Sequence, residues 1–443
     1  MRKVSRLSGI AAGVPTLYLL AGCADIAKVP LDSTFGPTPT LAPPNPETIP
    51  TIKIAPARGW PVGATPTAAA GFRVNALATN LDHPRWLYVL PNGDVLVAET
   101  NAPPRPEDEK GVKGKVVKMM MKKAGSARPS ANRIALLRDA DGDGTAETRT
   151  EFLEGLNSPF GMALVGQTLF IANTDAVVSV PYQNGATQIT AVPQKVADLP
   201  GGLLNHHWTK SLVANRDGSL LYVGVGSNSN IGENGIDQEE NRAAILEIDP
   251  ATRRTRVFAS GLRNPVGLAW QPQSGALWTS VIERDRLGSD LVPDYMTSVQ
   301  DGGFYGWPYS YFGSHVDERV KPPRPDLVAK AIVPDYALGP HTTSLGLAFY
   351  EGRLFPARYA GGAFIGQHGS WNRKPPSGYQ VIFVPFGADG RPNGPPEEIL
   401  GGFLNAAGEA LGRPVGVAID RAGALLVADD VGNVVWRVTP AAR

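Results

Sequence analysis

The chain has 443 residues, a formal net charge of +1, 50 glycines, 40 prolines and one cysteine. A net charge this close to zero excludes a global field that would attract nucleic acid, so we expect no nucleic-acid partner. The glycine and proline content favours many short strands joined by tight turns, which is typical of an all-β domain.

The first 22 residues have the order of an export signal. Three basic residues among the first six precede an apolar stretch from Ile10 to Leu20, and the tetrapeptide Leu-Ala-Gly-Cys ends at Cys23. This order resembles a bacterial lipobox, in which the cysteine becomes the lipidated N-terminus. We therefore expect residues 1–22 to be a lipoprotein signal peptide and Cys23 to carry a lipid anchor on the periplasmic side, with Ala24 favouring the outer membrane. The alternative is an ordinary signal peptide in which Cys23 is incidental.

Residues 23–70 are rich in proline, threonine and alanine, as in Pro37-Thr38-Pro39-Thr40. Such a composition favours an extended, polyproline-like chain over a packed core. We expect this segment to be a tether between the lipid and a globular domain that spans residues 71–443.

A five-residue phrase recurs along this domain. Pro-Phe-Gly-Met-Ala at 159–163 returns as Pro-Val-Gly-Leu-Ala at 265–269 and as Pro-Val-Gly-Val-Ala at 414–418, with looser copies at 84–88 and 344–348. Turn residues and a second apolar run follow most copies. A strand, a tight turn and a second strand, repeated along the chain, predict the inner hairpins of a β-propeller.

The length of the domain accommodates six blades with two insertions, at Asn101–Asn132 and Leu287–Asp335. The last strand, within Asn433–Val438, is predicted to pair with the first blade and to close the ring, which removes exposed sheet edges.

The first insertion carries six lysines between positions 110 and 123, around Met119–Met121. These lysines form either a docking site for an acidic electron acceptor or an anionic lipid, or a solvated face that packs its methionines against the blade.

Asp139, Asp141 and Asp143 place a carboxylate at every second residue of a glycine-containing turn. Crowded oxygen ligands of this kind suit calcium. An EF-hand would need glutamate at the twelfth loop position, where Thr150 stands, and Glu147 is a further candidate ligand. The sequence therefore predicts a calcium-binding turn, with a solvated acidic hairpin as the alternative.

His206 and His207 lie just before a predicted strand pair, a position that faces the axis of a propeller. A histidine there can act as a general base, because its ordinary pKa of about 6.5 lies near working pH. Metal binding and simple packing are the alternatives from the residues alone.

Arg263 and Asn264 immediately precede one copy of the phrase, Arg413 precedes the last copy, and Arg85 lies within the first. Guanidinium groups bind carboxylates bidentately, so three arginines at equivalent positions predict a pocket for a carboxylated ligand. Alternatively, each arginine pairs with an aspartate of a neighbouring blade.

Four motifs follow one another along the chain: Asn205–Thr209, Gly261–Pro265, Gly303–Pro308 and His368–Arg373. In this order, on a propeller pattern, they resemble the pyrroloquinoline-quinone (PQQ)-dependent sugar dehydrogenases. The sorbosone dehydrogenase-like branch is the nearer likeness and the soluble glucose dehydrogenases the more distant one. The resemblance covers about residues 72–440. It implies a six-bladed β-propeller with PQQ across the axial face and a calcium ion that touches its quinone.

The resemblance also implies roles for individual residues. The catalytic histidine of the family matches His207. The calcium beside PQQ takes backbone carbonyls from the loop that matches Glu283–Asp285, which includes Arg284 and Asp285. The positions that match the cofactor contacts are Arg263, Asn264, His341, Arg413 and either His368 or Arg373.

The implied activity is the PQQ- and calcium-dependent oxidation of a sugar or a sugar-derived aldehyde. His207 would take the hydroxyl proton while hydride passes to PQQ, and the electrons would leave to an acceptor, a quinone or a cytochrome. His206 departs from the soluble glucose dehydrogenases, which have an acidic residue there. A calcium-dependent propeller lactonase and a non-catalytic, surface-tethered binding propeller are the alternatives.

Overall fold

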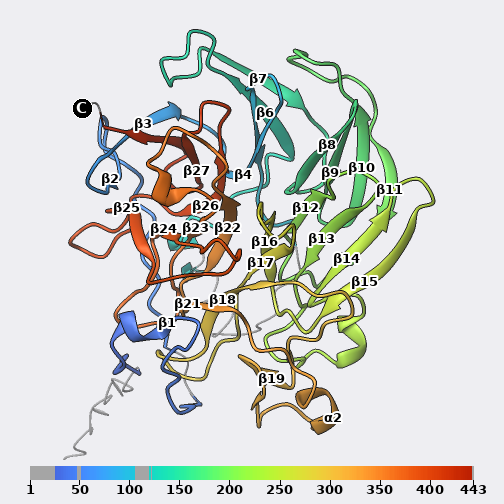
Figure 1. The fold of residues 1–443 in the computed structure, drawn as a ribbon, viewed down its shortest axis with the longest axis vertical. Coiled ribbons are helices and arrows are strands. Elements are labelled where there is room, and N and C mark those ends of the chain that lie inside the picture. Colours follow the sequence, from blue (N-terminus) through green and yellow to red (C-terminus); the bar gives the residue numbers. More distant parts are fainter. Residues whose placement is uncertain (1–24, 47–50, 105–118, 121, 442–443) are drawn as a thin grey trace, which may run out of the picture.

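The computed structural model describes residues 25–46, 51–104, 119–120 and 122–441. Six antiparallel sheets, each of four or five strands, surround one axis (Figure 1). The predicted six-bladed β-propeller is therefore confirmed. Helical structure in the described part of the chain consists of short turns such as α2 (Pro325–Val328), and no helix there is long and apolar enough to cross a bilayer.

The strands of each blade follow one another outward from the axis. Blades one to three consist of β4 (Pro84–Val89), β5 (Val95–Glu99), β6 (Arg133–Arg138) and β7 (Thr148–Leu153); β8 (Met162–Val165), β9 (Thr168–Ala172), β10 (Ala176–Pro181) and β11 (Gln194–Asp198); and β12 (Lys210–Ala214), β13 (Leu221–Val225), β14 (Ala244–Asp249) and β15 (Arg254–Ser260). Blades four to six consist of β16 (Pro265–Trp270), β17 (Leu277–Val281), β18 (Pro293–Ser298) and β21 (Tyr336–Pro340); β22 (Ser344–Phe349), β23 (Ala363–Gln367), β24 (Gln380–Val384) and β25 (Glu397–Gly401); and β26 (Pro414–Ile419), β27 (Leu425–Asp429), β28 (Val434–Pro440) and β3 (Phe72–Ala78).

Close packing of the blades explains why the repeated phrase contains a glycine. Inner strands of neighbouring blades converge on the axis, so the backbone of one blade passes directly over this glycine in another. A Cβ on Gly161 would overlap the backbone of Leu212, and a Cβ on Gly346 would overlap that of Val415. A larger residue would push the blades apart, so the phrase identifies the innermost strand of a blade.

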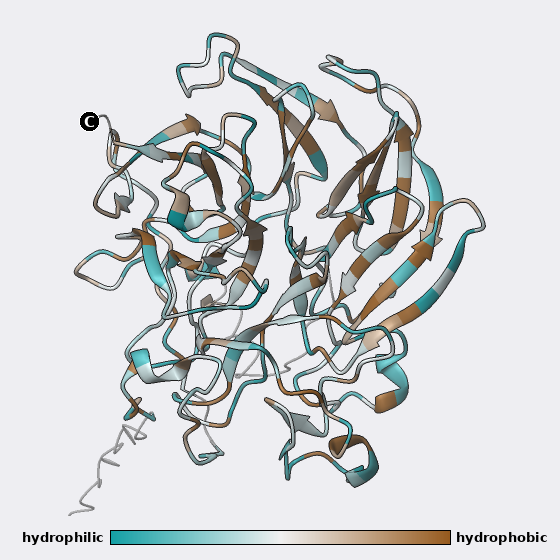
Figure 2. Ribbon diagram, in the orientation of Figure 1, coloured by the Kyte–Doolittle hydropathy of each residue, from teal (hydrophilic) through white to brown (hydrophobic). Residues whose placement is uncertain are grey.

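Apolar side chains fill the space between neighbouring sheets, and Figure 2 shows them concentrated in the strands of the blades. Near the starts of three inner strands they form a row of rings. The ring centroids of Trp86 and Phe160 lie 4.6 Å apart, and those of Phe160 and Trp208 lie 5.9 Å apart. This row ties blades one, two and three together and supports the residues that precede those strands.

The ring closes through the two ends of the domain. β28 pairs with β3, with Val438 opposite Val74 and Arg437 opposite Asn75. The expected closure is present, but its partner differs from the prediction: the first strand of the domain is the outer strand of the last blade, not a part of blade one. This arrangement fastens both chain ends with one hydrogen-bonded ladder.

The proline-rich segment lies on the propeller in its described parts. β1 (Phe35–Gly36) adds a strand to blade four beside β21, and β2 (Thr67–Ala68) adds one to blade five beside β25. The Trp60 ring contacts Phe403 and Trp436 edge-on, with centroids 5.5 Å away in both cases. The structure thus differs from the expected tether, because these two added strands and the half-buried Trp60 attach the segment to the propeller.

The second predicted insertion, Leu287–Asp335, contains β18 and is therefore part of blade four at its start. The extra chain is Val299–Asp335, which holds α2 and the small hairpin of β19 (Ser310–Tyr311) and β20 (His315–Val316). The first insertion lies between β5 and β6, as expected. Its residues 105–118 and 121 lie outside the described chain, and with them four of its six lysines.

Candidate active site

One end of the propeller, here called the axial face, collects the functional residues. Each inner strand begins at this end and the strand after it finishes there, as the pairing of Pro265 with Val281 and of Pro414 with Asp429 shows. Two cavities lie on this face, of about 600 Å³ and about 320 Å³, and Trp371 lines both. The residues that precede and follow the inner hairpins therefore face the axis, as the repeated phrase predicted.

His207 lines the larger cavity. Its Nδ1 atom lies 2.7 Å from the carbonyl oxygen of Ser227. A carbonyl only accepts, so Nδ1 carries the proton and Nε2 is the basic nitrogen. Burial, together with the charge of Arg263, holds the pKa of His207 well below its ordinary value. The ring is therefore neutral at neutral pH, the state that a general base requires.

Two neighbours shape the surroundings of His207. Lys210 is completely buried and its Nζ donates to the carbonyl oxygens of His207 and Trp208, each at 3.3 Å. His206 lines the same cavity, and its Nδ1 lies 2.5 Å from the carbonyl oxygen of Asn228. The imidazole of His206 thus occupies the position at which the sequence departs from the soluble glucose dehydrogenases.

Arg263 forms a second wall of the larger cavity and is only 4% exposed. Its guanidinium donates to the carbonyl oxygens of Asn230 at 3.2 Å and Glu283 at 2.6 Å, and lies 3.4 Å from the carboxylate of Asp285. The adjacent Asn264 Oδ1 is buried and has no hydrogen-bond partner in the described chain. A buried oxygen without a donor is a free hydrogen-bond acceptor next to this wall.

The Asp285 side chain at the cavity contacts residues of three other segments of the chain, one of which is Arg263. Its carboxylate accepts a hydrogen bond from Asn372 at 2.8 Å and lies 3.6 Å from His341 Nδ1. Burial raises its pKa, but the nearby His341 imidazole and the Arg263 charge outweigh burial and lower the pKa to about 2. His341 Nε2 donates to the carbonyl of Gly288 at 2.9 Å. The structure therefore places His341 behind Asp285, where it orients the carboxylate.

The smaller cavity is built around the buried carboxylate of Asp430. This carboxylate lies 2.5 Å from Arg85 Nη1, 2.9 Å from His368 Nε2 and 3.7 Å from His83 Nε2. Burial opposes ionisation of Asp430, but His368, His83 and Arg85 together hold its pKa well below the usual range. Burial lowers the pKa of His368 to about 4. Three basic side chains thus share one carboxylate, and at neutral pH Arg85 is the charged one, because burial lowers the pKa of both histidines.

Arg413 lines the same cavity and is held by the N-terminal segment. Its Nη2 donates to the carbonyl oxygen of Ala55 at 3.0 Å, and its guanidinium carbon lies 5.2 Å from the ring centroid of Tyr379. The Nε atoms of Arg413 and Arg85 are buried and have no hydrogen-bond partner in the described chain. Arg85 and Arg263 thus each have an aspartate partner, whereas no carboxylate of the described residues pairs with Arg413.

His368 and Arg373, between which the sequence did not choose, lie in different surroundings. His368 lines the smaller cavity. Arg373 is buried, and its guanidinium donates to the carbonyl oxygens of Ser289 and Pro375, each at 2.9 Å, and approaches Asp290 at 3.5 Å. Arg373 thus fastens the loop behind the site, and His368 is the one that a ligand would reach.

The loop Glu283–Asp285, the expected axial calcium loop, is heavily hydrogen-bonded. The Arg284 side chain is fully buried and donates to the carbonyls of Pro308 and Ser310 at 2.7 and 2.6 Å. The carbonyl of Glu283 accepts from Arg263, as described above. Within this loop the Asp285 carboxylate lines the larger cavity, and Glu283 Oε1 is buried without a hydrogen-bond partner in the described chain.

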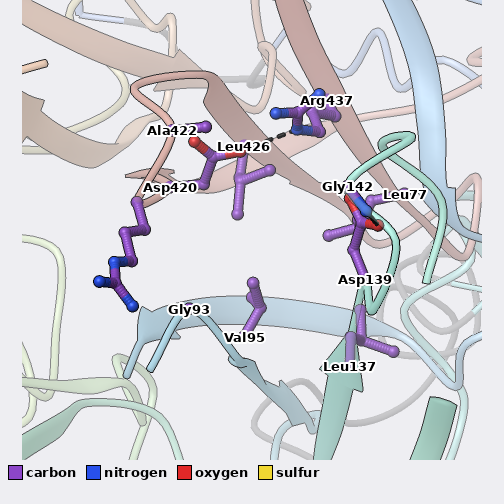
Figure 3. Close-up of a pocket in the computed structure, with 11 residues that line it drawn as sticks. Leu77, Gly93, Val95, Leu137, Asp139, Gly142, Asp420, Ala422, Leu426 and Arg437 are labelled. Atoms are coloured by element: carbon purple, nitrogen blue, oxygen red, sulfur yellow. Dashed lines mark hydrogen bonds and ion pairs between the residues drawn. The ribbon is translucent and has the colours of Figure 1, made fainter. Parts of the chain in front are cut away.

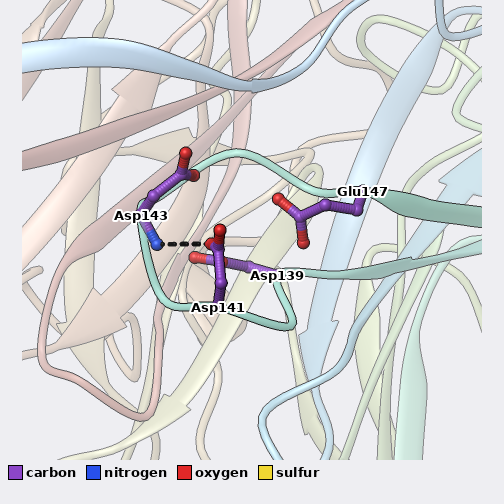
Figure 4. A group of neighbouring side chains, drawn as sticks. All are labelled: Asp139, Asp141, Asp143 and Glu147. Atoms are coloured by element: carbon purple, nitrogen blue, oxygen red, sulfur yellow. Dashed lines mark hydrogen bonds between the residues drawn. The ribbon is translucent and has the colours of Figure 1, made fainter.

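Asp139, Asp141 and Asp143 come together with Glu147, with carboxylate oxygens within 4.8 Å of one another (Figure 4). They lie in the loop between β6 and β7, at the end of the propeller opposite the axial face. Within the loop, Asp139 accepts hydrogen bonds from the backbone of Gly142 and Gly144, each at 2.8 Å. The predicted grouping is present, and the calcium that it would hold stays a prediction.

A cavity of about 190 Å³ adjoins this acidic loop between the first and last blades (Figure 3). Asp139 forms one wall, and the opposite wall carries Asp420, which accepts a hydrogen bond from Arg437 Nε at 2.8 Å. This cavity is separate from the axial site, because the turns that build it connect the far ends of the inner hairpins.

Several residues of the axial site were not anticipated from the sequence, namely His83, Asp430, Trp371 and Ile54. A usable signal existed for Asp430, which follows the second apolar run of the last phrase. The residues after the second strand of a hairpin share the axial face with those before the first strand. Ile54 had no such signal, because it comes from the segment that composition marks as a linker.

Two family models match the chain. The glucose/sorbosone dehydrogenase family matches residues 172–368, and the TrAA12-like family matches residues 328–441. The first stretch contains His207 and Arg263, and the second contains Arg413.

Three curated relatives show how far the sequence likeness extends. An uncharacterized protein of Borreliella burgdorferi is 29% identical over 294 residues, which are 64% of this chain and 76% of that protein. The aldose sugar dehydrogenase YliI of Escherichia coli is 30% identical over 104 residues, 23% of this chain and 26% of that enzyme. The PQQ-dependent pyranose dehydrogenase of Coprinopsis cinerea is 26% identical over 223 residues, 41% of this chain and 30% of that enzyme. The chain therefore matches less than a third of either named enzyme.

Solved structures share the fold over most of the chain. The PQQ domain of the Coprinopsis cinerea pyranose dehydrogenase, in its holo form, has a TM-score of 0.66 at 22% identity and covers 85% of this chain and 97% of that domain. The calcium structure of the Trichoderma reesei AA12 enzyme has a TM-score of 0.68 at 18% identity, covering 88% and 99%. At these identities the likeness establishes the propeller fold. The glucose/sorbosone dehydrogenase model matches the part of the chain that carries His207 and Arg263, and over that part the chain is similar to this family.

Proposed function

We propose that the protein is a PQQ-dependent oxidoreductase that oxidises a hydroxyl group of a sugar or of a hydrated, sugar-derived aldehyde, with calcium as a second cofactor. The observation that carries this proposal is the state of His207. Its ring is neutral, its orientation is fixed by the Ser227 carbonyl, and it lines a cavity beside Arg263 and Asp285. The relatives named as aldose and PQQ-dependent pyranose dehydrogenases support the choice of reaction.

The residues of the two cavities fit PQQ, which is flat and carries three carboxylates. The buried Nε atoms of Arg85 and Arg413 lack partners in the described chain, and His368 adds a further nitrogen beside them. Arginine forks suit carboxylates. Arg413, Arg85 and His368 would hold the cofactor at the smaller cavity, and Arg263 with Asn264 would hold it at the larger one. Bound PQQ would supply a two-electron acceptor for hydride, and calcium at Asp285 and the Arg284 carbonyl would polarise its quinone.

His207 performs the proton transfer in this proposal. Its Nε2 takes the proton of the substrate hydroxyl as the carbon–hydrogen bond of the same carbon breaks. Nδ1 keeps its proton throughout, because the Ser227 carbonyl holds it. The negative Asp285 carboxylate favours the imidazolium that forms. Because the pKa of His207 is low, the ring then releases the proton readily and returns to its basic form.

The lactonase alternative is less well supported. It requires side-chain carboxylates that converge on a metal at the axis. Throughout the described residues, the one group of three or more histidine, cysteine or acidic ligands that comes together is that of Asp139, Asp141, Asp143 and Glu147, at the opposite end. The axial face instead gathers arginines.

A titration of the purified protein with PQQ and calcium tests the proposed activity. Uptake should change the absorbance of PQQ and should bring dye-linked oxidation of an aldose, of sorbosone or of a simple aldehyde. Absence of both uptake and turnover would overturn the proposal. Lactone hydrolysis in the presence of calcium alone would favour the lactonase.

We further propose that the protein is exported and anchored in the membrane through a lipid on Cys23, which lies outside the described residues. The order of basic, apolar and small residues before this cysteine supports the assignment. Mass spectrometry of the mature N-terminus tests it, and Cys23→Ser should move the protein from the membrane fraction to the soluble one.

A further inference from the structure

The N-terminal segment is fastened to the axial face only two residues after Cys23. The backbone N–H of Ser289 donates to the Asp25 carboxylate at 2.6 Å, and the Ser289 hydroxyl donates to the Asp25 carbonyl at 3.0 Å. The next carboxylate of this loop, Asp290, accepts a hydrogen bond from the backbone N–H of Lys28 at 2.5 Å. The loop connects β17 with β18 and forms part of the wall of the larger cavity.

This docking limits where an anchor on Cys23 can lie. Two residues of fully extended chain span about 7 Å. A lipid on Cys23 would therefore hold Asp25, and with it this edge of the axial face, at the level of the lipid headgroups. The long tether that the composition of residues 23–70 suggested does not separate the anchor from the propeller.

Five exposed lysines lie along the same edge, and we call them the basic rim: Lys28, Lys53, Lys122, Lys123 and Lys374. They come from three segments of chain that are joined to one another by backbone hydrogen bonds. The N–H of Ala27 donates to the Lys374 carbonyl, and the N–H of Ala57 donates to the Lys123 carbonyl, both at 2.8 Å. The segments that carry the rim are therefore held side by side, although its members are far apart in the sequence.

Exposed apolar side chains lie among these lysines. Ile26 is 50% exposed, Met119 is 52% exposed and Trp371 is 37% exposed. The Trp371 carbonyl accepts a hydrogen bond from the N–H of Lys53 at 2.8 Å, which places the tryptophan on the rim. A mixture of lysines, aliphatic residues and a tryptophan is typical of surfaces that lie in a membrane interface.

One loop of the axial face, on blade three, is acidic. Glu233, Asp237 and Glu240 are exposed in the loop between β13 and β14, on blade three. Repulsion from anionic lipids would turn this side away from a membrane, whereas lysines near the surface are attracted to it. The charge distribution and the docking of Asp25 thus select the same edge.

We propose that the basic rim, with Ile26, Met119 and Trp371, rests on the anionic headgroups of the membrane that holds the anchor, so that both axial cavities open close to the bilayer surface. This proposal rests on the lipidation of Cys23 proposed above, and it is independent of the substrate. It also restricts the electron acceptor, because one that is dissolved in the bilayer or bound to it would meet the cavities directly.

Site-directed spin labels test the orientation. Apart from Cys23 the chain has no cysteine, so single substitutions label one position each in the lipidated protein. Lys374→Cys places a label on the basic rim, and Arg421→Cys places a matched label at the opposite end of the propeller, where Arg421 is exposed. The protein is reconstituted in vesicles of phosphatidylcholine with about one third phosphatidylglycerol, and the accessibility of each label to an aqueous relaxation agent is measured.

The label at 374 should be shielded several-fold relative to the same protein in detergent, and the label at 421 should be unchanged. Replacing Lys28, Lys53 and Lys122 together by glutamate should abolish the shielding. Equal accessibility of both labels in vesicles would overturn the proposal, as would a mature N-terminus without a lipid on Cys23. PQQ titration of the same samples reports separately on the proposed activity, so the two proposals fail by different measurements.

Discussion

Trp60 Nε1 donates a hydrogen bond of 2.7 Å to the carboxylate of Asp429, which joins the N-terminal segment to the last blade. The same carboxylate oxygen accepts from Trp436 Nε1 at 3.0 Å, and its other oxygen accepts from the backbone N–H of Arg413 at 2.8 Å. Burial raises the pKa of Asp429, so these donors are what stabilises its charge. The segment that composition suggests is a linker is therefore a structural part of the cavity wall that contains Arg413.

We expect Trp60→Phe to destabilise the protein without changing its fold. The substitution keeps the ring contacts but removes one donor from a buried carboxylate, which costs about 1–3 kcal/mol of the free energy of unfolding. Urea denaturation followed by circular dichroism measures the change. Trp436→Phe removes the other indole donor and is the matched comparison, with a similar expected loss. An unchanged midpoint in both variants would show that the carboxylate does not need the indoles.

His207→Gln should lower kcat by a factor of about 10² to 10⁴, the usual contribution of a general base. Glutamine removes the basic nitrogen but leaves the arginines and Asp285 in place, so PQQ uptake should persist. Steady-state kinetics together with the absorbance titration separate the two effects. His206→Gln is the control and should retain most of the activity, because its ring nitrogen already faces the Asn228 carbonyl. Comparable losses in both variants would contradict the assignment of the base.

The pH profile should reflect the lowered pKa of His207. Since the base works in its neutral form, kcat/KM should fall only when the pH approaches the pKa of His207 in the folded protein. This pKa lies well below 6.5. The fall of kcat/KM at low pH is therefore expected at a lower pH than the pKa of an ordinary histidine. His206 contributes to the lowering, so His206→Gln should move this fall toward higher pH. A fall at or above pH 6.5 in the wild-type protein would count against His207.

The architecture was readable from the sequence because its cause is local. The backbone of another blade passes over the glycine of the phrase, as it does at Gly161 and Gly346. This glycine therefore indicates an inner strand. The same logic placed His207, Arg263 and Arg413 on the axial face. The residues that follow the second strand face the axis for the same reason, and Asp430 could have been inferred from that rule.

Other parts of the site depend on long-range packing that no local pattern encodes. Ala55 meets Arg413 across 358 positions of the chain, and Asp25 meets Ser289 across 264. The surrounding prolines indicate an extended backbone, which is equally suited to a free tether and to a strap on a surface. The burial of Ala55 and the contacts of the half-buried Trp60 indicate the strap. The role of His341 behind Asp285 was hidden in the same way, because the loops that join them come from different strands.

Asp430→Asn should be strongly destabilising. The change removes the charge that Arg85, His368 and His83 share and leaves the largely buried Arg85 guanidinium without compensation, which costs about 3 kcal/mol. Affinity for PQQ should change as well, because the freed Arg85 loses its fixed orientation. Thermal unfolding measures the first effect and absorbance titration the second. Asp301→Asn removes one partner of the exposed pair with Arg256 and should have little effect, since surface pairs contribute little. If Asp430→Asn lowered the unfolding temperature no more than Asp301→Asn does, the central role of the Asp430 carboxylate would be contradicted.

Calcium should stabilise the protein through the acidic loop, independently of the axial site. The carboxylates of Asp141, Asp143 and Glu147 are exposed and lie close to that of Asp139 (Figure 4), so a bound cation would relieve their mutual repulsion. At a calcium concentration of about 100 times the dissociation constant, binding would add about 2.7 kcal/mol to the free energy of unfolding. Differential scanning fluorimetry with calcium and with a chelator measures the shift. The double variant Asp141→Asn with Asp143→Asn should lose most of it, whereas Asp217→Asn, in an exposed turn elsewhere, should keep it. An equal calcium shift in all three proteins would assign the effect to another site and leave the loop as an acidic turn held by its own backbone hydrogen bonds.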